Sequence, residues 1–401
     1  MAERLAKDFE KVYLYCPWEK SFPVVNDYII GQGIKGVVKV QNVWDVFDEI
    51  DIWVFPDLHY GAFQAWLKSQ GKKVFGACKG EEMEYDRTKM DEIMKGVGLD
   101  VPPGDNFTGM TALREHLKNN DNLFIKTNIF RGNHETWHHE NYDLSKPVLD
   151  ELTHSLGANA EQEVFLAKKP IDDVVEIGYD GLNINGKYPD TTIFGIEIKD
   201  RGYVGCVMDY DDLPSIVKEV NKKLSPVFKK YQYTGWYSNE IRAINDKKGF
   251  LLDQTCRQGS PPTEVAIELI DNFSECVNDV ANGEIPDLKF SYKYGVELII
   301  TSSWAKEELQ AIYYPDEIKD FVKIKNKCVI DGVTYFVPQG DGMTEIGAVV
   351  ACSNDLEDAF LEVQYRAKQI KGYCIEIDFS CIDEMRKEIE KLKSKNIKNN
   401  F

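Results

Sequence analysis

One stretch in the second half of the chain decides the fold class: Leu252-Asp253-Gln254-Thr255-Cys256-Arg257-Gln258-Gly259-Ser260-Pro261-Pro262-Thr263-Glu264. Its first half continues an apolar run and predicts a β-strand, along which side chains alternate between two faces. Asp253, Thr255 and Arg257 are therefore expected on one face. A second strand is predicted upstream, from 236 to 243, and the polar loop between the two is typical of a β-hairpin. This pairing can bring Glu240 alongside Asp253.

Two acids beside an arginine indicate a site for a metal and a triphosphate. Mg²⁺ prefers oxygen ligands, usually one or two carboxylates together with substrate phosphates. Arginine binds phosphate oxygens through two parallel hydrogen bonds. The alternative interpretation is an exposed hairpin with scattered charge. On the first interpretation, Glu240 and Asp253 are candidate metal ligands and Arg257 is a candidate phosphate contact.

The stretch from 252 to 264 resembles the signature Leu-Glu-Phe-Asn-Cys-Arg-Phe-Gly-Asp-Pro-Glu-Thr-Gln of phosphoribosylamine-glycine ligase (glycinamide ribonucleotide synthetase), a family of ATP-grasp enzymes. Other segments are similar in the same order: Phe75-Gly76-Ala77-Cys78, Glu163-Val164-Phe165-Leu166, Glu197-Ile198-Lys199-Asp200 and the C-terminal stretch 346–365. The similarity spans most of the chain, and the segment 252–264 is its specific part. The resemblance implies an ATP-grasp fold.

The resemblance also implies roles for individual residues. It makes Asp253 a magnesium ligand, with Glu240 and Thr255 as further metal ligands, and it directs Lys126 at the ATP phosphates. The remaining roles are adenine binding by Glu163, Val164 and Leu166, ribose binding by Asp172 or Asp173, a further phosphate contact at Lys199, and steadying of the transferred phosphoryl group by Arg257. Lys126 and Arg257 are thus the expected catalytic residues.

The activity that the resemblance implies is ligation of a carboxylate to an amine, with ATP and Mg²⁺ or Mn²⁺, through an acyl phosphate. The family's Gly-Gly-Arg-Glu-His turn, which receives the phosphate of phosphoribosylamine, is absent after the first strand, where Cys16-Pro17-Trp18 stands. We therefore expect a changed acceptor. The alternative is a catalytically degenerate ATP-grasp domain that binds nucleotides or partners, an interpretation that Thr255 and Ser260 favour.

The pattern of strands and helices predicts three domains in an α/β (α+β) chain. Residues 1–95 alternate strands with a helix, as in a Rossmann-like N-terminal domain with a parallel sheet. Residues 96–288 form the predicted ATP-grasp domain, and residues 289–401 form a β-rich C-terminal domain. This last domain is expected to end in a charged helix from 385 to 401 without an apolar face, as a frayed terminus.

Composition narrows the class of partner. The 401 residues carry 48 Lys and Arg against 67 Asp and Glu, a formal net charge of −19. Such a charge makes a nucleic-acid polymer an unfavourable partner and leaves small carboxylate and amine substrates. The sequence lacks an apolar run long enough for a membrane span, so we expect no membrane partner. A cytoplasmic monomer or homodimer is expected.

A second motif competes with this interpretation. The segment His134-Glu135-Thr136-Trp137-His138 fits the His-Glu-x-x-His pattern, in which two histidines one helical turn apart bind zinc. That pattern requires a helix with an apolar back face, and the neighbouring residues are polar and typical of a loop. A zinc metalloprotease is therefore the less favoured alternative, beside a histidine-rich polar loop.

Overall fold

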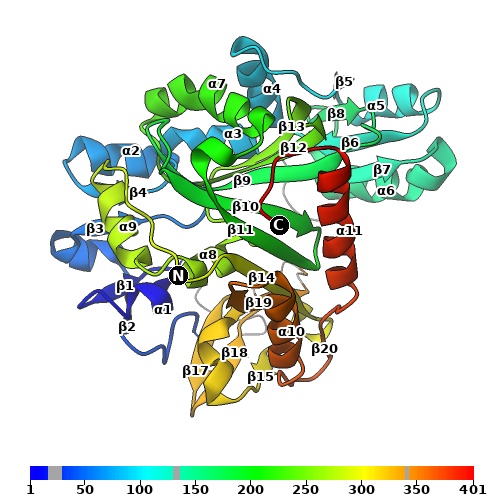
Figure 1. Cartoon of the computed structure of the whole chain (residues 1–401). Helices are drawn as coiled ribbons and strands as arrows, with labels where there is room; N and C mark the ends of the chain where they lie inside the picture. Colours follow the sequence, from blue (N-terminus) through cyan, green and yellow to red (C-terminus); the bar gives the residue numbers. More distant parts are fainter. Residues whose placement is uncertain (17–28, 130–135, 339–341, 343) are drawn as a thin grey trace.

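A computed structural model describes residues 1–16, 29–129, 136–338, 342 and 344–401 (Figure 1). Within these residues the largest sheet has nine strands, and all their pairings are antiparallel. In spatial order they are β13 (Lys248–Thr255), β12 (Thr234–Asn245), β9 (Val175–Ile184), β10 (Thr191–Ile198), β11 (Gly202–Asp209), β14 (Tyr294–Ser302), β19 (Glu345–Ser353) and β16 (Val322–Ile324), while β20 (Ile375–Glu376) pairs with the end of β14. The sheet thus runs across residue 288, where we predicted a domain boundary.

The two faces of this sheet differ in polarity because residue types alternate along its strands. In β9, Val175, Ile177 and Tyr179 lie in the main hydrophobic core, whereas Glu176 and Asp180 line a cavity on the opposite face. The apolar face is covered by helix α7 (Ser215–Tyr231), which buries one stripe of residues: Ile216, Val217, Val220, Leu224 and Phe228. The opposite face is apolar at one end, where Leu182, Ile193 and Trp236 pack with residues 265–281 in a second core. The cavity lies over another part of this face, which we call the polar face.

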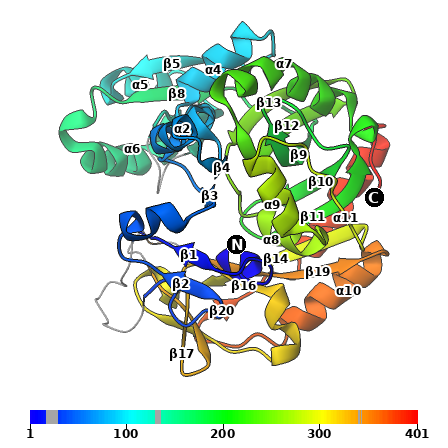
Figure 2. The same ribbon diagram turned by 90° about the vertical axis from the view of Figure 1, so that its left-hand side faces the viewer.

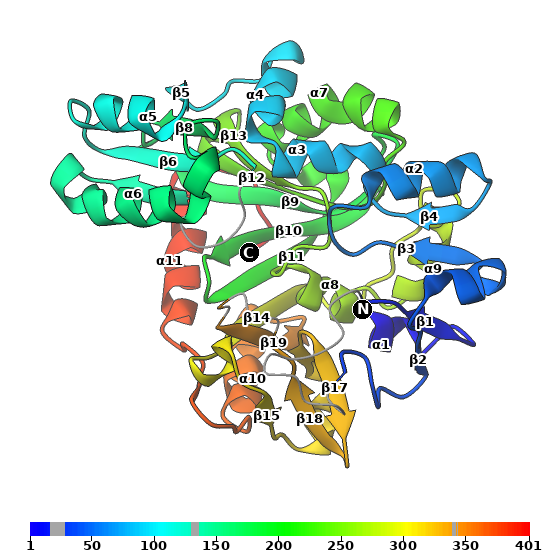
Figure 3. The ribbon, with the colours of Figure 1, turned by 180° about the vertical axis from the view of Figure 1, so that it is seen from behind.

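The C-terminal helix α11 (Cys381–Ser394) corrects one prediction. We expected a charged tail without an apolar face, and this is wrong, because Ile382, Met385, Ile389 and Leu392 are all buried. Their spacing of three and four residues places them on one side of the helix. Through this stripe α11 packs against β10 and β11 (Figure 3). The end of the chain is thus part of the core.

A second sheet contains four strands in the described part of the chain. Their order is β5 (Gly104–Thr108), β8 (Val164–Lys168), β6 (Leu123–Thr127) and β7 (Thr136–His139). Helices α5 (Met110–Leu117) and α6 (Tyr142–Leu156) pack on it around a separate core that includes Leu113, Ile125, Leu149 and Phe165. Figure 2 shows this unit at one end of the molecule, with β17 (Lys327–Ile330) at the other.

The N-terminal region contains the strand, helix and strand predicted from its sequence. Strand β3 (Ile52–Val54) leads into α2 (Gly61–Ser69) and then to β4 (Lys73–Phe75), which pairs with β3 in parallel. A second parallel pair joins β1 (Val12–Leu14) and β2 (Val37–Lys39). The region meets the large sheet at Gly76, whose amide donates to the Thr234 carbonyl oxygen over 2.6 Å.

The remaining elements complete a mixed α and β architecture. They are α1 (Ala2–Leu5), α3 (Glu82–Tyr85), α4 (Arg87–Gly96), α8 (Thr263–Leu269), α9 (Phe273–Ala281), α10 (Leu356–Ala367), β15 (Gln310–Ile312) and β18 (Val333–Phe336). In the part of the chain that the structure describes, none of the helices combines the length and the apolar character that crossing a membrane requires.

A row of glycines crosses the polar face of the large sheet. Gly178, Gly195, Gly205 and Gly295 are direct neighbours on β9, β10, β11 and β14. The side chain of Tyr203 lies over this row, and a Cβ atom at Gly195 would be 1.9 Å from its Oη. The missing side chains therefore let the tyrosine ring lie flat on the sheet.

Candidate functional site

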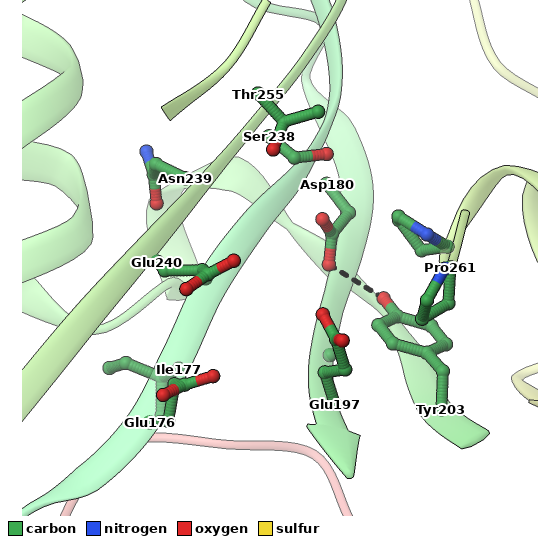
Figure 4. A pocket seen from close by; sticks show the side chains of 13 residues that line it. Glu176, Ile177, Asp180, Glu197, Tyr203, Ser238, Asn239, Glu240, Thr255 and Pro261 are labelled. Carbon is green, nitrogen blue, oxygen red and sulfur yellow. Dashed lines mark hydrogen bonds between the residues drawn. The ribbon is translucent and has the colours of Figure 1, made fainter. Parts of the chain in front are cut away.

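The site begins with the hairpin of β12 and β13, which pairs Glu240 with Asp253 and Ser238 with Thr255. The hairpin loop is held by the Asn245 side chain, whose Oδ1 accepts hydrogen bonds from the amides of Lys247 and Lys248. The pairing puts the proposed metal ligands Glu240, Asp253 and Thr255 side by side. Glu240 and Thr255 also line the cavity over the polar face (Figure 4).

Three further acids lie on the same face and join these residues. Glu176 and Asp180 come from β9 and Glu197 from β10, and all three line the cavity (Figure 4). We call the set Glu176, Asp180, Glu197, Glu240 and Asp253 the carboxylate face. Glu176, Asp180 and Glu197 were not among the predicted site residues. Their signal in the sequence is a single acid between apolar residues of a strand, as in Ile196-Glu197-Ile198.

Crowding of buried acids raises several pKa values on the carboxylate face. Burial, then the charges of Asp253 and Glu176, hold the pKa of Glu240 well above its usual value. Burial and the charge of Glu176 raise the pKa of Glu197 to about 8. The face therefore holds more carboxylate groups than it can keep ionised by itself at neutral pH.

Basic side chains compensate part of this negative charge. The ammonium group of Lys126, on β6, lies 2.5 Å from Asp253 Oδ2, and Lys126 is only 8% exposed. Burial raises the pKa of Asp253, but Lys126 and then Arg87 outweigh it and lower that pKa overall. Arg242 pairs with Glu176 over 2.7 Å. Lys126 thus extends from the four-stranded sheet to the large sheet, and its ion pair with Asp253 joins the two sheets at the site.

Lys199 follows β10 and belongs to the same charge cluster. Burial lowers its pKa, but the nearby carboxylates of Glu240, Asp200 and Glu197 outweigh this effect and raise the pKa overall. Lys199 is therefore held in its charged form beside the carboxylate face. The structure brings Lys126, Lys199, Glu240, Asp253 and Thr255 into one region, as the sequence analysis expected for these residues.

Arg257 lies just beyond the end of β13 and is fixed by the N-terminal region. Its Nε is 2.8 Å from Glu84 Oε1, and Glu84 Oε2 accepts a hydrogen bond from the Cys256 amide over 2.7 Å. The Glu84 side chain is 8% exposed, so this contact is largely screened from water. Glu84 thus fixes the orientation of the Arg257 side chain.

The proposed adenine-binding segment lies in the middle of a sheet. Val164 and Leu166 belong to β8, which is paired with β5 on one side and β6 on the other. The Glu163 carbonyl oxygen accepts from the Gly109 amide, and the Val164 carbonyl oxygen accepts from the Asn128 amide. A carbonyl oxygen has a second lone pair, which is what an adenine contact there would use.

The two candidate ribose ligands follow the proposed adenine-binding segment in the chain. Asp172 and Asp173 are both exposed, in the connection between β8 and β9. The Asp173 carboxylate forms an ion pair of 2.7 Å with Lys395, and this pairing lowers the pKa of Asp173. The Asp173 carboxylate is thus paired with a lysine near the end of the chain, and its role in binding a ribose stays a prediction.

The histidine motif lies only partly within the described residues. His134 and Glu135 are outside them, so the metal set of the zinc alternative is not described. Thr136–His139 form strand β7, whereas the motif requires a helix, and the His138 ring is hydrogen-bonded to Asn122 over 2.8 Å. Among the described residues there is no group of three or more His, Cys, Asp or Glu side chains placed to hold a metal ion by themselves.

Comparison with known proteins places this geometry in a fold. No protein-family model and no curated protein sequence matches the chain. Solved structures do match. Phosphoribosylamine-glycine ligase from Thermotoga maritima has a TM-score of 0.70 at 15% identity, over 93% of this chain and 94% of that one.

Two further structures are similar at lower scores. The biotin carboxylase domain of 2-oxoglutarate carboxylase from Hydrogenobacter thermophilus, in complex with MgADP, ADP and bicarbonate, has a TM-score of 0.59 at 14% identity, over 83% of this chain and 77% of that one. N5-carboxyaminoimidazole ribonucleotide synthetase from Thermotoga maritima has a TM-score of 0.54 at 14% identity, over 82% and 84%. At these identities the likeness establishes the fold, and the chain therefore has the ATP-grasp fold.

Proposed function

We propose that this protein is a ligase that uses ATP and Mg²⁺ to join a carboxylate to an amine through an acyl phosphate. Two observations support the proposal: the ATP-grasp fold and the resemblance of residues 252–264 to phosphoribosylamine-glycine ligase. The proposed amine differs from phosphoribosylamine, because the turn that would receive its phosphate is missing from the sequence. The proposed reaction is thus of the family's kind, with another acceptor.

The observation that carries the proposal is the charge arrangement over the carboxylate face. Lys126 pairs with Asp253 over 2.5 Å, and Arg257 lies at the end of the same strand as Asp253. Lys199, which is exposed, is near enough to Glu240 and Glu197 for their charges to raise its pKa. Lysine and arginine bind phosphate oxygens, and acids beside them bind the metal that accompanies a nucleotide. A network of ion pairs that only stabilises the fold does not need more acidic than basic side chains.

The residues fit a divalent cation. Burial, then the charges of Asp253 and Glu176, raises the pKa of Glu240, and a cation bound there would favour the ionised form. Mg²⁺ needs only one or two protein carboxylates when phosphates complete its shell, which agrees with the lack of a larger ligand group in the described residues. Glu240 and Asp253 would hold it, with Thr255 beside them, and Mn²⁺ has the same ligand preference. When bound, the ion neutralises phosphate charge.

The protein's own residues would then act by binding and orientation. A substrate carboxylate oxygen attacks the γ-phosphorus of ATP and ADP leaves, which gives an acyl phosphate. The amine attacks the carbonyl carbon, loses a proton and expels phosphate. Lys126 and Lys199 would stabilise the negative charge on the phosphate oxygens during both steps. Arg257, held by Glu84, would orient the transferred phosphoryl group.

The experiment is a screen for release of phosphate and ADP with Mg²⁺ over panels of carboxylates and amines. Turnover that depends on one acid and one amine would support the ligase. Asp253→Ala should then abolish the turnover, because it removes a metal ligand and the ion-pair partner of Lys126. We expect this variant to keep the fold. Asp209→Ala, at an exposed position at the end of β11, is the control and should keep full activity. Unchanged turnover in Asp253→Ala would contradict the site.

A second candidate is a degenerate domain that binds nucleotide without turnover. The ion pair of Lys126 with Asp253 favours it, because each group then satisfies the other without a ligand. Thr255 also replaces the family's asparagine. Calorimetry distinguishes the two functions, since the degenerate domain would bind MgATP and release no phosphate with any acid and amine pair.

A further inference from the structure

A buried glutamate in the middle of β14 has no hydrogen-bond partner among the described residues. Glu297 is 0% exposed, and both of its carboxylate oxygens are unpartnered. Its direct neighbours in the sheet are Tyr203 on β11 and Val350 on β19, and neither is basic. Leaving a buried polar group unpaired costs about 1–3 kcal/mol, so its presence calls for a ligand or a function.

Two other glutamates are near enough to Glu297 for their charges to act on it, and we call the three the glutamate cluster. Glu264 lies in the first turn of α8 and Glu345 at the start of β19. Ser260 Oγ bridges them, at 2.7 Å from Glu264 Oε1 and 3.3 Å from Glu345 Oε1. Glu264 Oε2 is buried and unpartnered as well. Three buried oxygens, two on Glu297 and one on Glu264, are therefore free to accept hydrogen bonds.

The positive charge near the cluster is small. Lys325 pairs with Glu345 over 2.6 Å at the partly exposed edge of the cluster, where both side chains are 25% exposed. Burial, then the charge of Lys323, lowers the pKa of the Met1 α-amino group, and the charge of Glu264 acts in the opposite direction. Burial, then the charges of Glu264 and Glu345, hold the pKa of Glu297 well above its usual value. The cluster thus has more acid than its neighbours compensate.

The glutamate cluster lies next to the carboxylate face on the same side of the sheet. Glu197, Tyr203 and Glu297 are direct neighbours in one row across β10, β11 and β14. Two strand spacings, about 10 Å, separate the backbones of Glu197 and Glu297. Pro261 and Pro262 line the cavity and lead directly into α8, which carries Glu264. The wall of the cavity and the glutamate cluster are thus connected through Tyr203 and through residues 261–264.

We infer that the glutamate cluster binds a positively charged nitrogen group of the acceptor, which is an amine with a second cationic group, such as a diamine or a basic amino acid. This inference rests on the proposed function, because only a ligase has an acceptor amine. An ammonium group has three N–H donors, which matches the three unpartnered oxygens of Glu297 and Glu264. A cation bound there would favour the ionised form of these glutamates, whereas a phosphate or carboxylate would add negative charge beside them, so the cluster selects a cation.

The first test measures binding without ATP, on the full chain. We expect 1,4-diaminobutane to raise the thermal midpoint in a saturable way, because a ligand that binds only the folded state stabilises it. 1,4-Butanediol, its neutral analogue, should give no shift, and NaCl at matched ionic strength controls for screening. Glu297→Gln should lose the diamine shift. No shift in the unaltered protein, or an equal shift in Glu297→Gln, would overturn the inference.

Two more variants keep this test decisive. Glu268→Gln is the matched control, because Glu268 is on the same helix as Glu264 but is paired with Lys323 outside the cluster. It should keep the diamine shift. Glu264→Gln removes one of the three acceptor oxygens at a partly exposed position, and it replaces Glu297→Gln if that variant does not fold. A diamine shift that survives in Glu264→Gln would also overturn the inference.

A second test separates this inference from the proposed function. With an active acid and diamine pair, Glu297→Gln should raise the KM for the diamine at least tenfold and leave the KM for ATP unchanged. Diamine binding that depends on Glu297, with no ATP turnover for any pair, would support the cation site and reject the ligase. ATP turnover with a diamine KM that is equal in Glu297→Gln would support the ligase and overturn the cation site.

Discussion

The carboxylate face lies on the large sheet and the glutamate cluster at the contact of this sheet with α8, and the two groups of acids differ in their counter-charges. On the carboxylate face, Lys126 lies 2.5 Å from Asp253 and Arg242 lies 2.7 Å from Glu176. In the glutamate cluster, the two oxygens of Glu297 have no partner among the described residues. Buried charge is stable only when it is paired. The first region is thus suited to phosphates with a metal, and the second to a cation.

The substitution with the largest expected effect removes a counter-charge from the carboxylate face, so that this face resembles the glutamate cluster. Lys126→Met removes the ammonium group beside Asp253 and leaves a buried carboxylate unpaired. We expect ATP turnover to fall about 100-fold or more, since loss of one positioned donor to a transition-state oxyanion has effects of about 100- to 1,000-fold. Phosphate release measures it.

The control for this change is Lys118→Met, at an exposed lysine of the same four-stranded unit, which forms an ion pair with Glu115. Its turnover should equal that of the unaltered protein. Turnover in Lys126→Met within a factor of two of the control would contradict the role of Lys126 and remove the contrast between the two regions.

The next change sharpens the contrast through stability. Glu297→Leu removes an unpaired buried carboxyl group, so the thermal midpoint without ligand should rise by a few degrees, consistent with about 1–3 kcal/mol for such a group. Glu268→Leu is the counterpart, because it leaves Lys323 without its carboxylate, and its midpoint should fall. Scanning calorimetry measures both. A fall in Glu297→Leu would mean that the glutamate is satisfied in the folded protein.

A smaller effect concerns the pH dependence of stability and Asp180, which belongs to the carboxylate face. Burial raises its pKa from 3.8 to about 6, although hydrogen bonds from Tyr203 and Ser238 act in the other direction. The folded state therefore binds this proton more tightly than the unfolded state. The resulting stabilisation is complete below pH 3.8 and is lost as the pH rises through about 6.

Asp180→Asn removes this titration. The thermal midpoint of the unaltered protein should fall more steeply between about pH 4 and 7 than that of the variant, which a melting series at each pH would show. Asp209→Asn, at the exposed end of β11, should follow the unaltered protein. Parallel curves for Asp180→Asn and the unaltered protein would mean that the proton on Asp180 does not contribute.

The smallest effect is expected at Asp173, outside both regions. Its carboxylate is exposed and paired with Lys395, and such surface pairs contribute about 0–1 kcal/mol. Asp173→Ala should leave the KM for ATP and the thermal midpoint unchanged. A tenfold rise in the KM for ATP would show that Asp173 binds the ribose, as the family resemblance implied.

The sequence was sufficient to predict the parts of the site that neighbouring residues build. Glu240, Asp253 and Thr255 lie on two strands joined by a short hairpin, so alternation along each strand predicts that they meet. The fold class followed from the resemblance of one segment and is confirmed by structures at 13–15% identity. Both inferences rest on contiguous sequence.

The parts that were missed depend on the order of distant strands. Glu176 and Glu197 meet Glu240 only because β9 lies between β12 and β10 in the sheet, and no local pattern specifies that order. The apolar face of α11 was missed for another reason: only four apolar residues are spread over eleven positions rich in charge. Glu297 carries a signal that was not used, since it is a lone acid in a run of apolar strand residues.

The glycine row bears on how this protein can diverge from its relatives. A side chain at Gly195 would lie 1.9 Å from the Oη of Tyr203, and this hydroxyl donates a hydrogen bond of 2.7 Å to Asp180. A larger residue at Gly195 therefore requires a smaller residue at position 203 in the same lineage. Asp180 then loses the hydrogen bond that Tyr203 donates to it. The three positions should be inherited as a unit, whereas single replacements of the acids around them leave the backbone of the sheet intact.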